Sequence, residues 1–177
     1  TFRRLLNEVY PKAPVLSVVS DTWDFWDVVT NKVRALKDDI LARPGKLVIR
    51  SDSGEPVKIL CGDLEAPATS PAFRGAVECL WDVFGGTVNE KGFKVLDPHI
   101  GLIYGDSITP TRAIHILDGL KQKGFASGNV VLGIGSYTYQ DATRDTYGFA
   151  VKSTAGTVDG TMVPIFKDPK TDDGIKK

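Results

Sequence analysis

The sequence has no excess of either charge and no long apolar run. Lys plus Arg and Asp plus Glu both number 22 among 177 residues, so the formal net charge is zero. A balanced chain without a basic block lacks the electrostatic footprint of nucleic-acid and membrane-surface proteins, and we expect neither type of partner. No apolar stretch approaches the roughly eighteen residues that a membrane-spanning helix needs.

Cysteine and histidine are also scarce, with two of each. Cys61 and Cys79 are not spaced with a histidine as metal ligands are, so we interpret them as core or surface thiols rather than zinc ligands. No signal peptide is recognisable, and a reduced cytoplasmic location is expected. Neither His99 nor His115 follows a predicted strand beside an acid, so neither is expected to be a catalytic base.

The rest of the composition is that of an ordinary globular chain, with 42% hydrophobic and 25% charged residues. Its length favours one domain, residues 1–177. The chain begins with Thr1 and passes directly into a helical pattern over residues 1–10. We therefore expect it to be a fragment of a longer protein.

A repeated order of strand, polar loop and helix is the main structural signal. Short apolar runs predict strands at 15–19, 46–50, 100–104 and 129–132. A helix that Asp21 or Thr22 could cap follows the first strand, and its apolar face is Trp26, Val29, Val33, Leu36 and Ile40. This alternation favours an α/β fold, either a parallel sheet or a barrel.

The later helices and two antiparallel pairs complete the expected elements. Helices are predicted over 70–84, from Thr109-Pro110 to Gly124, and through 140–147. In the second of these, Ile114, Leu117 and Leu120 are expected to point inward. Residues 87–95 read as a hairpin, and 148–152 is expected to pair with 161–166 around a turn at 155–160.

Polar residues follow all four predicted strands, and parallel strands bring such loops to one edge. The four loops begin at Ser20-Asp-Thr-Trp-Asp24, Arg50-Ser-Asp-Ser-Gly54, Gly105-Asp-Ser107 and Gly133-Ile-Gly-Ser136. The aspartates Asp24, Asp52 and Asp106 suit ribose hydroxyls or Mg²⁺ bound to phosphates.

Phosphate could be held by the backbone of the Gly133–Ser136 loop, or by the cations Arg144 and Lys152. Each motif alone fits a solvated turn or a surface ion pair equally well. Trp23, Phe25 and Trp26 could stack on a planar ring, but their helical spacing favours core packing.

Taken together, six motifs in order resemble the nicotinamide phosphoribosyltransferase family of type II phosphoribosyltransferases. They are Val18-Val-Ser-Asp-Thr-Trp-Asp24, Ile49-Arg-Ser-Asp-Ser-Gly-Glu-Pro56, Tyr104-Gly-Asp106, Gly133-Ile-Gly-Ser136, Thr143-Arg-Asp145 and Ile165-Phe-Lys-Asp-Pro169. The resemblance covers nearly the whole chain and lies in the carboxyl-terminal half of the family's longer chain. It implies a partial TIM-like (β/α) barrel of parallel strands with a small antiparallel excursion.

The family joins nicotinamide to 5-phosphoribosyl 1-diphosphate, giving nicotinamide mononucleotide and pyrophosphate for NAD synthesis. The resemblance implies Mg²⁺, ATP as a possible coupled substrate, and a homodimer of the full-length enzyme. By this resemblance Ser20 holds the carboxamide, Asp24 supports a catalytic histidine, and Arg50 lies against the pyridine.

The remaining roles implied by the resemblance concern the ribose and the phosphates. Asp52, Asp106 and the Gly105 backbone would bind the ribose hydroxyls, and Gly135 and Ser136 the 5-phosphate. Three cations would contact phosphate groups, partly across the dimer interface: Arg144, Lys152 and Lys167. Candidate catalytic residues are therefore Asp24, Arg50 and Asp52.

Two local departures and one absence qualify the resemblance. Ser51 stands where the family has proline, and Ser136-Tyr137 replaces glycines in the phosphate loop. The family's catalytic histidine, its amide-selecting aspartate and its pyridine-stacking aromatics precede the matched segment. We expect this chain alone to bind phosphosugar weakly and not to be a competent transferase. Two alternatives are a nicotinate phosphoribosyltransferase and a non-catalytic phosphosugar-binding or interface domain.

Overall fold

A computed structural model describes residues 1–105, 107–135, 140, 142, 146–149 and 151–171. Its centre is a four-stranded parallel sheet in the order β1-β2-β5-β6. The strands are β1 (Val15–Val19), β2 (Lys46–Ser51), β5 (Ile100–Tyr104) and β6 (Val130–Leu132). All four agree with the strands predicted from the apolar runs, to within one residue at each end.

Each strand of the sheet pairs with the one that precedes it in that order. Val19 lies opposite Arg50, which lies opposite Ile103. A crossover between parallel strands is right-handed, so a consecutive order places the connecting helices on one face of the sheet.

The segments around the first crossover are helical. They are α1 (Phe2–Arg4) and η1 (Leu5–Val9) before β1, and α2 (Phe25–Asp27), η2 (Val28–Lys32), α3 (Val33–Ala35) and α4 (Lys37–Leu41) after it. The predicted apolar face is correct in outline, because Val29, Val33 and Ile40 are fully buried. The predicted cap is wrong: Asp24 caps α2, and its carboxylate accepts from the Asp27 amide at 3.0 Å.

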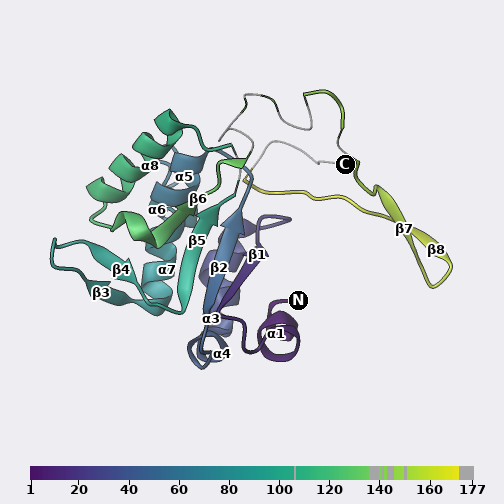
Figure 1. Ribbon diagram of the computed structural model, residues 1–177, viewed down its shortest axis with the longest axis horizontal. Helices are drawn as coiled ribbons and strands as arrows, with labels where there is room; N and C mark the ends of the chain where they lie inside the picture. The colour runs from purple at the N-terminus through teal and green to yellow at the C-terminus, as the bar shows by residue number, and fades with distance from the viewer. Residues whose placement is uncertain (106, 136–139, 141, 143–145, 150, 172–177) are drawn as a thin grey trace.

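Helices also follow the second and third strands. They are α5 (Pro56–Cys61), α6 (Pro71–Arg74), α7 (Ala76–Phe84), α8 (Pro110–Gln122) and the short η3 (Ser127–Asn129). Figure 1 shows α5, α6, α7 and α8 together on one side, whereas α1 lies beside the β1 edge. The sequence prediction missed α5, although Glu55 caps it and Pro56 occupies its first turn. Gly75, with a φ of 80°, breaks the single helix predicted over 70–84 into α6 and α7.

The face of α8 that packs inward agrees with the prediction at Leu120 and differs from it at Ile114 and Leu117. Ile116 and Leu120 are buried, whereas Ile114 and Leu117 are 58% and 42% exposed. The correction follows from the contact between α5 and α8. A side chain on Gly119 would contact the Cys61 sulfur at 2.9 Å, so the two helices meet closely at this glycine and bury the adjacent face.

The hydrophobic core lies between the sheet and its helices. Leu47 and Ile49 of β2 and Leu102 of β5 are almost fully buried and belong to one cluster with the helix side chains. Successive strand residues point to opposite faces. The other face carries exposed Val15, Val19 and Val131 on the two edge strands.

Two antiparallel hairpins stand apart from the main sheet. The predicted hairpin near residues 87–95 is confirmed as β3 (Gly86–Val88) paired with β4 (Lys94–Leu96). The second pair is β7 (Ala155–Val158) with β8 (Thr161–Pro164), so the prediction of a strand at 148–152 and a turn at 155–160 was wrong. The tight turn at Asp159-Gly160 has positive φ at both residues, which places it within the expected loop.

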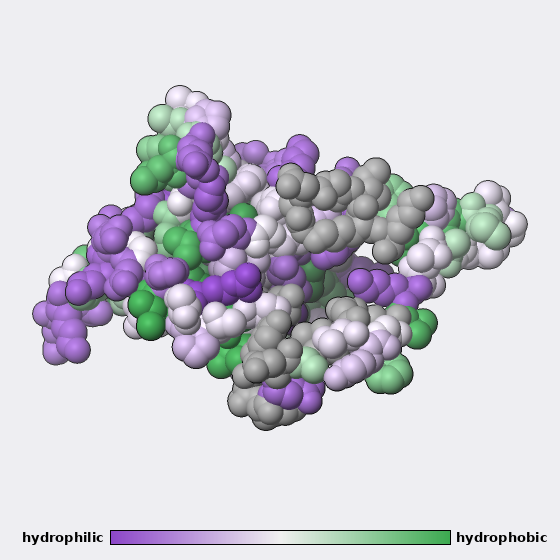
Figure 2. Space-filling view, turned by 90° about the horizontal axis from the view of Figure 1, so that it is seen from above, coloured by the Kyte–Doolittle hydropathy of each residue, from purple (hydrophilic) through white to green (hydrophobic). Residues whose placement is uncertain are grey.

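The β7–β8 hairpin, residues 155–164, forms an arm that projects from the body (Figure 1). Apolar side chains gather on it in Figure 2, and exposed members include Val158, Met162 and Val163. Half of the predicted helix over 140–147 lies outside the described residues, and the described half is not helical. No helix in the described part of the chain is both long and apolar enough to cross a membrane.

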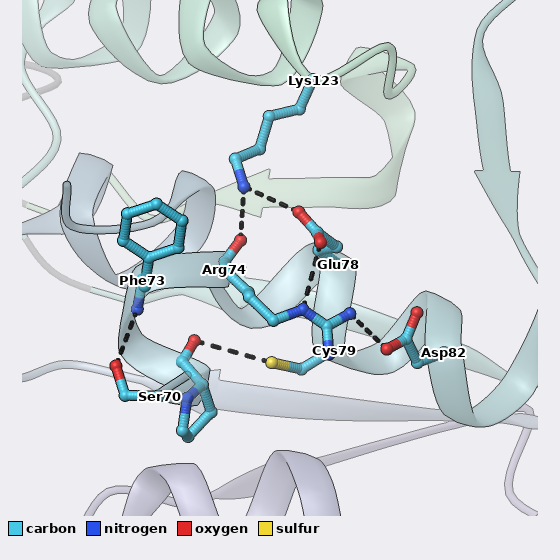
Figure 3. A network of polar contacts seen from close by, with 8 residues as sticks. Ser70, Phe73, Arg74, Glu78, Cys79, Asp82 and Lys123 are labelled. Carbon is cyan, nitrogen blue, oxygen red and sulfur yellow. Dashed lines mark hydrogen bonds and ion pairs between the residues drawn. The ribbon is translucent and has the colours of Figure 1, made fainter. Parts of the chain in front are cut away.

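A network of charged side chains joins α6, α7 and α8 on the helical side of the molecule (Figure 3). The Lys123 ammonium donates to the Glu78 carboxylate and to the Arg74 carbonyl, both at 2.7 Å. The Arg74 guanidinium in turn pairs with Glu78 at 3.1 Å and with Asp82. Cys79 lies beside this network, and its thiol contacts the Pro71 carbonyl at 3.7 Å.

Both cysteines are buried free thiols, so of the two alternatives that the sequence left open, core or surface, the structure supports the core. Burial raises the pKa of the Cys61 and Cys79 thiols to about 11.

Candidate functional site

The loops that follow the strands begin side by side at one edge of the sheet. The strand ladder continues one residue past each strand, through bonds from Ser20 N to Arg50 O, Gly105 N to Ser51 O and Gly133 N to Tyr104 O, at 2.7–2.8 Å. These bonds place the four predicted loops in one row. The expectation that parallel strands collect them at a single edge is confirmed for the described residues.

Arg50 and Asp52 form a bidentate ion pair at the end of β2. Arg50 Nε donates to Asp52 Oδ1 at 2.9 Å, and Arg50 Nη2 donates to Oδ2 at 3.0 Å. The side chains are 38% and 24% exposed, so the pair is partly open to solvent. A planar guanidinium bound at two points has a fixed orientation, which a single surface contact would not give.

Gly105 leaves the space that this ion pair occupies. A Cβ atom at this position would overlap both Asp52 Oδ1 and Arg50 Nε. Gly133 leaves similar space, because its Cβ would lie 2.6 Å from the Gly105 carbonyl carbon. The absence of a side chain at Gly105 therefore lets the Arg50–Asp52 pair lie across the end of β5, and its absence at Gly133 lets the end of β6 approach the Gly105 backbone.

Asp21 is a residue of this edge that the sequence prediction considered only as a helix cap. It is fully buried, and its Oδ2 atom accepts from the Asp52 amide at 2.8 Å. Its other oxygen, Oδ1, is buried without a hydrogen-bond partner among the described residues. A polar residue directly after a buried strand was the only sequence signal that could have singled it out.

Asp24 lies at the start of α2 and binds Lys170 from the far end of the chain, with Lys170 Nζ 2.7 Å from Oδ2. Partial burial would raise the pKa of Asp24, but hydrogen bonds from Lys170 and the Asp27 amide outweigh it and lower the pKa. No local pattern could predict this pair, because 146 residues separate its members.

Residues 166–171, which we call the strap, return from the arm and cross the loop after β1. The Asp168 amide donates to Thr22 O at 2.9 Å, and the Lys170 amide donates to Trp23 O at 2.8 Å. Phe166 packs edge-on against Trp23 with ring centroids 5.4 Å apart. The strap thus lies against the strand-end loops through backbone bonds and one aromatic contact.

A cavity of about 710 Å³ opens beside the strap, at the ends of β2 and β5. Its lining includes Asp52, Gly54, Tyr104, Ser107, Arg112 and Lys170. The Tyr104 hydroxyl donates to Gly54 O at 2.6 Å and holds the loop after β2 against β5. Gly54 has a φ of 84°, and its lack of a side chain lets the Thr171 carbonyl approach.

The other predicted site residues are placed less closely. Ser20 is buried, and its hydroxyl donates to Val18 O at 2.7 Å. Lys167 is half-buried within the strap, and Lys152 is exposed three residues before β7. Gly135 has a φ of 63°, as a loop that presents backbone amides often requires. Asp106, Ser136 and Arg144 lie outside the described residues.

The rings of the chain require one correction, which concerns Trp23. His99 has an acid partner, because its Nδ1 lies 2.8 Å from Asp97 Oδ1, but this pair precedes β5 at the opposite edge of the sheet and does not follow a strand. Phe25 is fully buried as predicted, whereas Trp23 is 53% exposed. Trp26 is half-buried and contributes to the cavity lining.

Residues 6–177 match the nicotinate phosphoribosyltransferase (NAPRTase) family. The chain belongs to this family. It is 56% identical to the nicotinamide phosphoribosyltransferase of Acinetobacter baylyi, over all of this chain and 36% of that protein. The protein of the same name from Mycoplasma pneumoniae is 44% identical, over 97% of this chain and 38% of its own length.

A third relative, from Xanthomonas campestris and also named nicotinamide phosphoribosyltransferase, is 34% identical over 98% of this chain and 34% of its own length. The chain therefore spans about a third of the length of the curated relatives that it matches. This share agrees with the expectation that it is a fragment, and the resemblance seen in the six motifs is confirmed.

Proposed function

We propose that this chain forms the phosphoribosyl-binding part of an enzyme that transfers phosphoribose from 5-phosphoribosyl 1-diphosphate to nicotinamide. The products are nicotinamide mononucleotide and pyrophosphate, as in NAD synthesis. The observation that carries the proposal is the Arg50–Asp52 pair, which stands over Gly105 at the carboxyl edge of the sheet. In α/β proteins ligands bind at this edge.

The chemistry of phosphoribosyl transfer suits such an edge. The bond between ribose and diphosphate breaks as the pyridine nitrogen attacks, and positive charge develops at the ribosyl carbon. Fixed carboxylates stabilise that charge and accept hydrogen bonds from ribose hydroxyls, a role that we assign to Asp52 and Asp106. Cations neutralise the phosphates, a role that we assign to Lys152, Lys167 and Arg144, with backbone amides at Gly135 and Ser136.

The amide is the pyridine substituent that Ser20 favours. Its hydroxyl proton is already donated to Val18 O, so the oxygen is left to accept a hydrogen bond. A carboxamide has N–H groups that can donate to this oxygen. A carboxylate has only acceptor oxygens, and the Ser20 oxygen would repel them. Nicotinate is the alternative substrate, which the name of the matching family supports. Competition between the two pyridines in the complete enzyme distinguishes them.

Mg²⁺ is proposed as a companion of the diphosphate rather than as a resident ion. No group of three or more His, Cys, Asp or Glu side chains able to hold a metal gathers among the described residues. Mg²⁺ at such sites commonly uses one or two carboxylates together with substrate phosphates, and the acids at the strand ends fit that limited role. Coupling to ATP would need a histidine beside Asp24, and His99 and His115 lie elsewhere, before β5 and on α8.

The consecutive strand order supports the proposal of a partial barrel. A doubly wound sheet reverses its order and places helices on both faces, whereas a barrel keeps one order and one helical face. The exposed Val15 and Val131 on the open face fit a surface that further strands cover. We also propose a cytoplasmic location, with which two buried free thiols agree.

A homodimer is proposed from the arm. Two-stranded hairpins are marginal in water, and Val158, Met162 and Val163 expose apolar surface that a second copy could cover. Light scattering should report twice the mass of the chain, and the Met162→Asp variant should have the mass of a single chain. A monomer at all concentrations in the unmodified chain would overturn this part of the proposal.

The main test is ligand binding to the chain followed by product formation. We expect calorimetry to detect weak binding of 5-phosphoribosyl 1-diphosphate with Mg²⁺, and its loss in Asp106→Ala. We expect the chain alone to form no nicotinamide mononucleotide. Formation at rates near those of a full-length relative would contradict the fragment proposal. An absence of binding would favour a purely structural interface domain.

A further inference from the structure

Asp21 is a buried charged group that no step of the proposed reaction uses. Its side chain is 0% exposed at the end of β1. Carboxylates are rarely buried to this extent unless a strong partner holds them, because removing the charge from water costs free energy. The partner of Asp21 is therefore the clue to its role.

That partner is the backbone of the candidate site. Asp21 Oδ2 accepts from the Asp52 amide at 2.8 Å, and the bond joins the loop after β1 to the loop after β2. The bond fixes the backbone of the residue whose carboxylate holds the Arg50 guanidinium at two points.

The rest of the loop after β2 has few side-chain restraints near Asp52. Ser51 makes a long contact of 3.5 Å with Ser53 O, and the Tyr104 hydroxyl holds Gly54 O two residues beyond Asp52. Asp21 Oδ1 stays buried without a described partner. Burying one of the two carboxyl oxygens without a partner is costly, so packing and stability alone do not account for Asp21.

We propose that Asp21 is a positioning residue that holds Asp52, and through it Arg50, in the space above Gly105. The inference rests on the proposed function, because it assigns Asp21 to the same phosphoribosyl site. Asp21 does not touch the reacting atoms in this scheme. It acts through the Asp52 amide, and the orientation of the Arg50–Asp52 pair is what it determines.

The test compares three variants of the chain. Asp21→Ala removes the acceptor, and Asp21→Asn retains an oxygen that can accept from the Asp52 amide. Asn129→Ala is the matched control, because Asn129 is buried and bonds Leu96 N and Lys94 O near the amino end of β6, at the opposite edge of the sheet. Asp21→Ser, whose hydroxyl is too short to reach the amide, replaces the alanine variant should that variant not fold.

Hydrogen exchange of the Asp52 amide is the first measurement, and it needs no ligand. We expect faster exchange in Asp21→Ala than in Asn129→Ala at matched global stability, with protection restored in Asp21→Asn. The second measurement is binding of 5-phosphoribosyl 1-diphosphate with Mg²⁺. It should weaken by about tenfold or more in Asp21→Ala, as is typical when a supporting residue is lost, and should change little in the other two variants.

Two outcomes would overturn the inference. One is an Asp52 amide that exchanges equally in Asp21→Ala and in Asn129→Ala. The other is faster exchange in Asp21→Ala with unchanged binding, since the amide would then be restrained without consequence for the site. Should the unmodified chain bind no phosphosugar, the proposed function fails, and the exchange comparison still decides whether Asp21 holds Asp52.

Discussion

The network around Glu78 and the cluster around Asp52 are built from the same charged groups but differ in their surroundings. In the Glu78 network each side chain is paired, and Lys123 ties α8 to the end of α6 (Figure 3). At the strand ends, Gly105 leaves space for the Arg50–Asp52 pair. A list of ion pairs alone would not separate the two regions.

Unsatisfied buried atoms separate them more clearly. Four buried side-chain atoms lack a hydrogen-bond partner among the described residues, and three of these belong to the loops and strap at the strand ends: Asp21 Oδ1, Ser53 Oγ and Thr171 Oγ1. The residues of the Glu78 network contribute none of the four. Native structures satisfy nearly all buried polar groups, so such a concentration marks a region arranged for something other than stability.

The substitution expected to have the largest effect is Gly105→Ala. The new methyl group would overlap Asp52 Oδ1 and Arg50 Nε, so the ion pair has to move. We expect a loss of about 1–3 kcal/mol in the free energy of unfolding, as for an overpacked site. Binding of 5-phosphoribosyl 1-diphosphate, measured by calorimetry, should weaken by about a hundredfold.

Gly128→Ala is the control for this substitution, because a Cβ at Gly128 meets nothing within 4 Å and its φ is not positive. Its stability should change by no more than about 0.5 kcal/mol. Equal effects of the two alanines on binding would remove the distinction between the strand-end cluster and the rest of the surface.

Glu78→Gln tests the opposite region and should affect stability without affecting binding. Partial burial would raise the pKa of Glu78, but hydrogen bonds from Lys123 and Arg74 outweigh it and lower the pKa. A lowered pKa contributes stability above the unfolded value of 4.5, and this is lost as the pH falls through the folded pKa.

Urea unfolding should therefore separate wild type and Glu78→Gln by about 1 kcal/mol at pH 7, a figure that allows for partial exposure. The difference between the two should shrink as the pH falls below 4.5 and through the folded pKa of Glu78. A difference in stability that does not depend on pH, or a change in ligand binding, would show that the network does more than hold the helices together.

Lys170→Met should have a smaller effect than Gly105→Ala and Glu78→Gln, and this effect should be confined to the strap and its contact with Asp24. Loss of its ammonium should raise the pKa of Asp24 toward 3.8, because Lys170 supplies the largest of the contributions that lower it. The stability that ionised Asp24 contributes is present above pH 3.8 and lost as the pH falls through its folded pKa. A carboxyl ¹³C titration measures the pKa, and an unchanged value would contradict the Lys170–Asp24 contact.

The smallest expected effect concerns thiol reactivity. Burial raises the pKa of Cys61 and Cys79 to about 11, so little thiolate is present at pH 8. Iodoacetamide should label both thiols only as the chain unfolds in urea, and mass spectrometry can follow the labelling. Labelling of Cys79 well before Cys61 would mean that the Glu78 network opens separately from the core.

The features that could be predicted from the sequence are those that depend on local pattern. Four apolar runs gave the strands, and the polar residues after them gave a common edge because parallel strands require one. Arg50 and Asp52 are two residues apart, so their contact needed only a correct reading of where β2 ends. The six motifs then gave the family.

The features that could not be predicted depend on contacts between distant segments. Lys170 reaches Asp24 across 146 residues, and no local pattern encodes that pairing. In α8, Ile114 and Leu117 compete with Ile116 and Leu120 for the inward face. The contact of α5 with Gly119 decides the outcome, and α5 had itself been missed. The first strand of the arm was predicted too early in the chain, at 148–152, because Ala155–Val158 carries turn-forming residues within a strand.

The consecutive pairing of the strands has a consequence for how the chain is made. Each strand joins the edge formed by the strand before it in the sheet, so β1 and β2 can associate while the segment of β5 is still being synthesised. At each stage the next βα unit can pair with a strand that has already been synthesised. A ribosome that releases this chain from its amino end therefore delivers the units in the order in which the sheet can add them.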